Sequence, residues 1–187
     1  MLPLPELLVS AQADGAALTN SVSQTSILPT AARAVVAANV LDRIGKRLHL
    51  KATGRISTLV TTPGTLLFEV KLGSVVIASS GLLTLNVVAK VNVGWKLDWD
   101  MTLRAIGTGT AANFMHQGLW TSEAVIGNPL PTVGGSASHV LPYNTAPVVG
   151  TGFDSTAAAI LDLFATWSSA SASNSIQLHQ YDVLIKN

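Results

Sequence analysis

The sequence lacks cysteine and is poor in charge. Cysteine is absent from all 187 residues, which excludes a disulfide framework, a thiolate metal site and a cysteine nucleophile. Lys, Arg, Asp and Glu make up 11% of the chain, against roughly 25% in an ordinary soluble domain. A monomer with so few charged residues would expose much apolar surface to water. We therefore expect part of that surface to be buried against other subunits.

The net charge is also small. Its formal value is +1, whereas nucleic-acid-binding proteins carry a strong basic excess, so we expect no nucleic-acid partner. Residues 72–89 are uncharged and about as long as a marginal membrane helix. Glycines and serines interrupt this stretch, and its β-branched residues favour strands. We therefore predict two strands joined at residues 79–81, and no membrane partner. The hydrophobic fraction of 48% is too high for a disordered chain.

Three stretches alternate between two faces, one of them apolar, a pattern typical of half-buried strands. They are residues 48–57, 66–72 and 95–105. In the third stretch, Trp95 and Trp99 share the face that is predicted to line a core. Asp98 and Asp100 share the opposite face, which is predicted to point outward.

Several segments leave the choice of element open. Residues 160–167 fit helical spacing and strand alternation, and we favour a strand because the surrounding segments are predicted strands. Residues 31–41 pose the same choice, although valines there lower the helix propensity. A final strand is predicted to place Ile176 and Tyr181 on opposite faces. Residues 127–152, rich in Gly, Pro, Ser and Thr, are predicted to form a long loop, either functional or held by a partner.

Together these segments predict an all-β chain of about eight to ten short strands. We expect a single-domain antiparallel jelly-roll sandwich over residues 13–187, preceded by an extended N-terminal arm over residues 1–12. Prolines at positions 3 and 5 exclude a regular helix at the start of the arm. An apolar arm is expected to lie against a neighbouring subunit. Its leucines are therefore candidate assembly contacts: Leu2, Leu4, Leu7 and Leu8.

No pattern in the sequence indicates catalysis, a metal or a cofactor. Residues 107–112 formally match a dinucleotide fingerprint, but no helical pattern follows them, so a hairpin loop is expected. Asp98 and Asp100 are expected to be solvated or to pair with basic residues on a neighbouring strand. The histidines lack a metal-ligand spacing and are interpreted as surface or interface residues. They are His49, His116, His139 and His179.

Five of the eleven basic residues gather within residues 43–55. One interpretation is a contact with an anionic partner, such as an acidic capsid surface or nucleic acid. The other is a solvated strand face, and no aromatic residues accompany the charges to stack on bases. These candidate contacts are Arg43, Lys46, Arg47, Lys51 and Arg55.

Six segments together resemble a family of small proteins encoded in the genomes of tailed bacteriophages. They are Ala13–Thr19, Gly45–Ser57, Val60–Thr65, Leu85–Trp95, Phe153–Ala157 and Ser175–Tyr181. The resemblance spans residues 13–185, nearly the whole chain. It implies a jelly roll of the tumour-necrosis-factor-like type, which commonly trimerises. It also implies a virion component, assembled in the host bacterial cytoplasm, without catalytic residues.

We therefore expect a non-enzymatic virion structural protein, a capsid decoration or cement protein that trimerises and binds the major capsid lattice. The alternative is a tail-associated module that binds a receptor or a carbohydrate, which exposed loop aromatics such as Trp120 or Tyr143 would favour. The expected partners are further copies of the chain and the major capsid or tail proteins of the same virion.

Overall fold

The computed structural model describes residues 5–59, 64–124 and 138–186. Within these ranges the chain forms thirteen strands and one short 3-10 helix, η1 (Thr30–Ala32). Every pairing between these strands is antiparallel. None of the described helical structure is long and apolar enough to cross a membrane.

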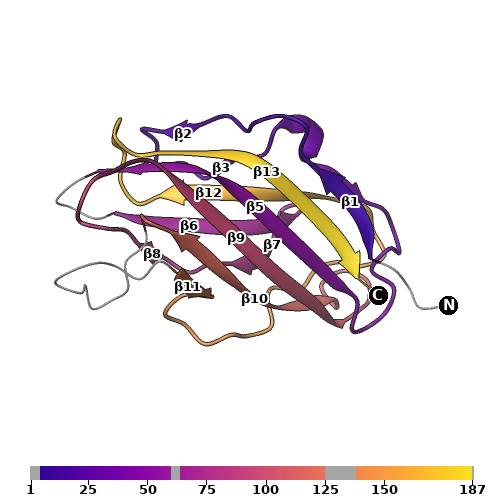
Figure 1. Ribbon diagram of the computed structural model, residues 1–187. Coiled ribbons are helices and arrows are strands. Elements are labelled where there is room, and N and C mark those ends of the chain that lie inside the picture. Colours follow the sequence, from indigo (N-terminus) through magenta and orange to yellow (C-terminus); the bar gives the residue numbers. More distant parts are fainter. Residues whose placement is uncertain (1–4, 60–63, 125–137, 187) are drawn as a thin grey trace.

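Seven strands form the larger sheet, sheet A. Its order is β1-β13-β5-β9-β10-β11, and β2 also pairs with β13 (Figure 1). The bounds are β1 Glu6–Ser10, β2 Leu18–Thr19, β5 Arg47–Thr58, β9 Lys90–Ala105, β10 Asn113–Ser122, β11 Ser138–Leu141 and β13 Ser175–Lys186.

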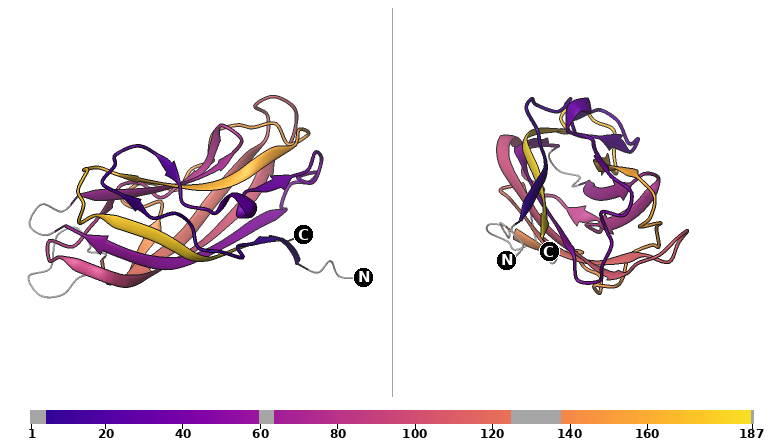
Figure 2. Two further views of the ribbon diagram at one scale, coloured as in Figure 1. Left: turned by 90° about the horizontal axis from the view of Figure 1, so that it is seen from above. Right: turned by 90° about the vertical axis from the view of Figure 1, so that its right-hand side faces the viewer.

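Six strands form the second layer, sheet B. Its order is β3-β12-β6-β7, with β4 beside β12 and β8 beside β6. The two sheets lie face to face and enclose the interior (Figure 2). The bounds are β3 Thr25–Ser26, β4 Ala34–Val36, β6 Thr65–Leu72, β7 Val75–Ser79, β8 Leu83–Thr84 and β12 Ala159–Trp167.

The long strands change sheets along the chain: β5 lies in sheet A, β6 in sheet B, β9 in sheet A, β12 in sheet B and β13 in sheet A. This arrangement confirms the predicted all-β antiparallel sandwich. The described strands exceed the expected eight to ten because β2, β3, β4 and β8 have only two or three residues each. Such short strands show no alternation in the sequence.

Both ambiguous segments contribute strands. Residues 160–167 lie within β12, as favoured. Residues 31–41 contain the end of η1 and then β4, so neither a long helix nor a long strand forms there. Within the predicted 127–152 loop, β11 pairs with β10, and residues 127–137 lie outside the described ranges. Residues 107–112 connect β9 to β10, as expected for a hairpin loop.

The core between the sheets is built on aromatic side chains. Trp95 and Trp99 are buried as predicted, and Trp120 is buried on the neighbouring strand β10. Phe68 reaches across from sheet B, with its ring centroid 5.5 Å from that of Trp95 and 5.7 Å from that of Trp120. Aromatic side chains bury the largest apolar areas and dominate the stability of a core. These contacts therefore hold the two sheets together at their centre.

Two strand glycines make room for the tryptophans. Gly54 pairs in register with Trp95, and Gly118 pairs with Trp99. A β-carbon at Gly118 would lie 2.5 Å from the carbonyl oxygen of Asp98 and 2.8 Å from Cδ1 of Trp99. Since real β-carbons do not approach other atoms so closely, only glycine fits at this position.

The last strand differs from the prediction. A β-bulge between Leu178 and Gln180 shifts the register of β13 against β5. The extra residue reverses the alternation, so Ile176 and Tyr181 both point into the core and are buried. The prediction that they lie on opposite faces is wrong for this reason.

His116 on β10 is buried. Its Nδ1 accepts a hydrogen bond of 3.3 Å from Nε1 of Trp99, and the two rings meet edge to face. Burial lowers the pKa of His116 below its ordinary value of 6.5. The hydrogen bond requires an unprotonated Nδ1, so the neutral imidazole is the form that the core accommodates.

Replacement of Gly118 by alanine is expected to destabilise the protein by about 1–3 kcal/mol, because the new methyl group displaces Trp99 or the β9 backbone. Gly94→Ala is the matched control, since a β-carbon at Gly94 has no neighbour within 4 Å. Urea unfolding followed by tryptophan fluorescence measures both variants. An equal stability loss in both would contradict the packing argument.

The free energy of unfolding is expected to fall as the pH drops below 6.5 through the contribution of His116. The folded state holds the lowered pKa, so the unfolded state takes up the proton first and gains stability on acidification. Unfolding experiments at pH 7.5 and 5.5 on the wild type and His116→Gln measure this difference. The variant should lose less stability than the wild type over this interval, and equal losses would refute the role of His116.

Candidate functional site

Polar side chains cover the outer face of sheet A, and the strand register sets them in rows. One row runs from Asp182 on β13 through Lys51 on β5 to Asp98 on β9, each residue directly opposite the next. Negative, positive and negative side chains thus alternate across three strands, although Lys51 forms no ion pair with either aspartate among the described residues. Leu119 and Val140 continue the row across β10 and β11.

The neighbouring row has a different composition. Leu184 on β13 lies opposite His49 on β5, His49 opposite Asp100 on β9, and Asp100 opposite Gln117 on β10. Leu7 on β1 pairs with Leu184 and begins the row. The outer face therefore has a polar centre on β5, β9 and β10, and apolar residues at both of its lateral edges.

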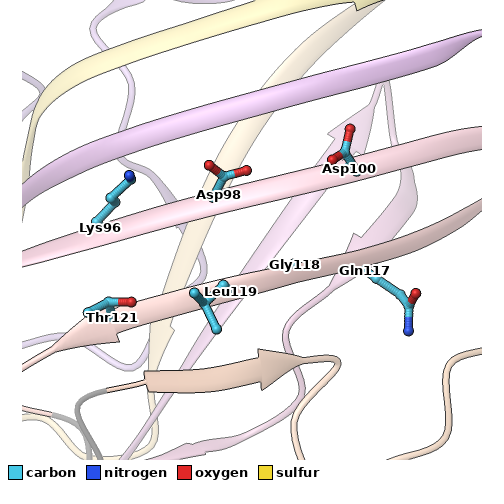
Figure 3. Close-up of a pocket in the computed structure, with 7 residues that line it drawn as sticks. All are labelled: Lys96, Asp98, Asp100, Gln117, Gly118, Leu119 and Thr121. Carbon is cyan, nitrogen blue, oxygen red and sulfur yellow. The ribbon is translucent and has the colours of Figure 1, made fainter.

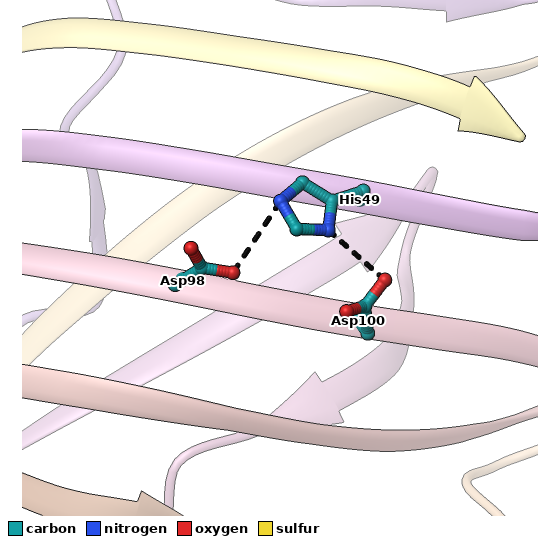
Figure 4. Close-up of side chains that lie close together, drawn as sticks. All are labelled: His49, Asp98 and Asp100. Carbon is teal, nitrogen blue, oxygen red and sulfur yellow. Dashed lines mark hydrogen bonds and ion pairs between the residues drawn. The ribbon is translucent and has the colours of Figure 1, made fainter. Parts of the chain in front are cut away.

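His49 lies between two carboxylates at this polar centre. Its Nδ1 is 3.0 Å from Oδ1 of Asp100, and its Nε2 is 3.4 Å from Oδ1 of Asp98 (Figure 4). The residue is only 8% exposed, while both aspartates are partly open to solvent. One ligand atom from each residue lies within 4.8 Å of those of the other two, as in a metal-binding group.

A shallow depression lies beside this cluster, over β9 and β10. Its volume is ≈ 240 Å³. Figure 3 shows the side chains of Lys96, Asp98 and Asp100 on one strand and those of Gln117, Leu119 and Thr121 on the next. Carboxylates accept hydrogen bonds, the ammonium group donates them, and the amide and hydroxyl do both. The depression can therefore bind a ligand that carries both donors and acceptors.

The predicted basic cluster is divided by the structure. Arg47, Lys51 and Arg55 lie four positions apart along β5 and so share the outer face of sheet A with the site. Arg55 donates hydrogen bonds of 3.1 and 2.8 Å to Oε1 of Gln177. The remaining two precede β5, and Lys46 forms an ion pair of 2.9 Å with Asp42. Among the described residues a carboxylate thus pairs with Lys46 alone of the five, and Arg55 contacts a neutral amide.

Two of the predicted assembly leucines, Leu7 and Leu8, lie on an edge strand. Residues 6–10 of the expected arm pair with β13 as β1 and so form part of sheet A. Leu7 is 57% exposed, whereas Leu8 is half-buried and packs against the core. Leu2 and Leu4 lie outside the described residues.

The interpretation of the histidines as surface or interface residues is wrong for three of them. His49, His116 and His139 are buried, and His49 has two carboxylate neighbours. Only His179 is partly exposed, with its Nδ1 3.0 Å from Oδ2 of Asp14. The two aspartates beside His49 lie on a strand about fifty positions further along the chain, so spacing in the sequence could not indicate them. Asp98 and Asp100, which were expected to be solvated or to pair with basic residues on a neighbouring strand, are partly exposed and both lie beside His49 on β5.

Of the aromatic residues expected to favour carbohydrate binding, Trp120 is not on the surface and Tyr143 is only partly exposed. Trp120 is fully buried within β10 rather than exposed in a loop. Tyr143 packs against the core, and its ring lies 4.2 Å from that of His139. Recognition of a ligand at the described face of sheet A must therefore rely on hydrogen bonds and charge rather than on stacking on these two rings.

The outer face of sheet B has a different chemistry. Asp162 accepts a hydrogen bond of 2.6 Å from Ser26 and lies 3.4 Å from Nε of Arg33. Burial raises the pKa of Asp162 above its ordinary value, although Ser26 and Arg33 favour the charged form. Exposed Val35 and Ile160 flank this pair. The outer face of sheet B thus has a polar group of its own, in which Asp162 lies opposite Lys71, beside exposed apolar side chains.

Comparison with known proteins adds a distant likeness of fold. No protein-family model and no curated protein matches the chain. A solved structure that matches is the CBM2 module of the evolved Dit of Lactobacillus casei BL23 phage J-1. The two are 8% identical over 98% of this chain and 97% of that chain, with a TM-score of 0.38. A TM-score this low supports no inference about function. The strand pairings themselves define the chain as an antiparallel β-sandwich.

Proposed function

We propose that the chain is a non-enzymatic, tail-associated binding module of a bacteriophage virion, and that the outer face of sheet A binds a saccharide. The observation that carries this proposal is the set of hydrogen-bonding side chains in register around the depression between β9 and β10. A saccharide presents many hydroxyl groups, each of which donates and accepts. The placement in a virion rests on the resemblance of residues 13–185 to proteins of tailed phages.

The shape of the depression supports binding over catalysis. Enclosed small-molecule sites measure roughly 300–1,000 Å³, whereas this one is an open depression of ≈ 240 Å³. Such a surface suits a saccharide chain that lies across the strands. Asp100 and Gln117 are well placed to contact its hydroxyls, and Leu119 offers an apolar surface to the C–H groups of a sugar ring.

A second candidate function is assembly, which the apolar edges of the same face favour. Leu7 is 57% exposed at one edge and Val140 is 66% exposed at the other. Burial of such surface supplies about 25 cal/mol per Å² before the costs of association. In this candidate the chain forms a homotrimer and decorates the major capsid lattice or docks on tail proteins. Nucleic acid and membrane are not among the partners we propose.

Gln117→Ala is expected to weaken saccharide binding by about two- to tenfold, the effect of losing one hydrogen bond worth about 0.5–1.5 kcal/mol. Gln24→Ala is the matched control, because Gln24 bonds to Glu69 on the sheet B side of the molecule. A glycan array that includes host-envelope polysaccharides identifies the ligand, and calorimetry then measures the affinity of each variant.

The absence of any bound glycan on the array would contradict the saccharide proposal. An equal loss of affinity in Gln117→Ala and Gln24→Ala would move the binding surface away from the depression. Both glutamines are exposed, so neither substitution is expected to disturb the sandwich fold.

Val140→Asp is expected to shift a homotrimer to monomers if the edge of sheet A forms the subunit contact. A buried, unpaired carboxylate costs several kcal/mol at an interface. Val35→Asp is the matched control, because Val35 is 59% exposed on the outer face of sheet B. Light scattering on the purified proteins measures the mass, and a monomeric wild type would contradict the assembly candidate.

A further inference from the structure

The two nitrogens of His49 have different surroundings. Nδ1 lies within hydrogen-bond distance of Asp100, at 3.0 Å. A neutral imidazole carries one N–H, and a carboxylate can only accept, so this contact places the proton on Nδ1. Nε2 then presents its lone pair in the opposite direction, toward Asp98.

Nε2 of His49 is buried and has no hydrogen-bond partner. The atom that faces it, Oδ1 of Asp98, is also an acceptor and lies 3.4 Å away. Two acceptors that face each other repel unless a cation lies between them. In the described part of the chain no lysine or arginine comes within ion-pair distance of Asp98, so the side chains nearby do not supply that cation.

The separation of these two atoms fits a bound metal ion. Zinc binds histidine nitrogen and carboxylate oxygen at about 2.0–2.2 Å, so two ligand atoms of a tetrahedral zinc ion lie roughly 3.3–3.6 Å apart. The observed 3.4 Å falls in this interval. In many metal sites a carboxylate that does not bind the metal accepts a hydrogen bond from the second ring nitrogen of a metal-binding histidine and fixes the orientation of the ring. Asp100 occupies the position of that carboxylate.

We propose that His49 Nε2 and Asp98 bind a divalent transition-metal ion of the zinc type, with Asp100 as the residue that positions the imidazole. The nitrogen ligand favours such an ion over calcium or magnesium, which prefer oxygen alone. Asp98 also lines the depression, so the remaining coordination positions can take water or an oxygen of a bound ligand. This site is independent of the identity of that ligand.

The test is a metal titration of the untagged, chelator-treated protein at pH 7.5. Cobalt is added first, because its visible absorption reports tetrahedral coordination, and zinc is then added to displace it. We expect one equivalent of cobalt to bind saturably. His49→Gln and Asp98→Asn should abolish the absorption, and Asp100→Asn should weaken binding by about 10–100-fold.

His179→Gln is the matched control, because the exposed His179 contacts a single aspartate, Asp14, through Nδ1. It should bind cobalt like the wild type. Melting curves without metal establish that the variants fold, and Asp98→Asn carries the test if His49→Gln does not, since Asp98 is partly exposed.

The competing occupant is a proton, which would make His49 an imidazolium held by both carboxylates. Nitrogen NMR of the imidazole separates the two cases. A ring with protons on both nitrogens at pH 7.5, unchanged by added zinc, would overturn the proposal. Cobalt binding that persists in both His49→Gln and Asp98→Asn would overturn it equally.

Discussion

The packing of Trp95, Trp99 and Trp120 between the sheets is the constraint on which the rest of the structure depends. These side chains point inward from β9 and β10, and a shift of either strand by one residue would move them into solvent. Gly54 and Gly118 allow the tryptophans only the observed pairing, because a side chain at either glycine would collide with the indole opposite. The register of the three central strands of sheet A is thereby fixed.

The same register creates the outer face. Successive residues of a strand point to opposite sides, so fixing the tryptophans inward fixes Asp98 and Asp100 outward. Because β5 is held against β9, His49 comes to lie opposite Asp100 and Lys51 opposite Asp98. The placement of the site's residues is thus a consequence of core packing.

How much of this could be predicted depended on how local each feature is. Alternation within 95–105 correctly placed both tryptophans and both aspartates, because a period of two is visible in any ten residues. The environment of His49 could not be predicted, since it requires the pairing of two strands far apart in the sequence. Tyr181 was assigned to the wrong face because a bulge interrupts the alternation without a signal in residue type. Trp120 was expected among exposed loop aromatics, whereas it lies within β10, which runs from Asn113 to Ser122.

The distribution of charge over sheet A separates the two kinds of contact that the face can make. Burial of Lys51, Asp98 and Asp100 in a dry protein interface would cost several kcal/mol per ion unless each found a partner. A hydrated ligand such as a saccharide, or a metal ion, satisfies these groups without that cost. Burial of the apolar side chains of Leu7 and Val140 at the edges carries no such desolvation cost and is favourable. The polar centre therefore suits a small or hydrated ligand, and the subunit contacts of the proposed assembly are expected at the edges, where they would leave the depression open.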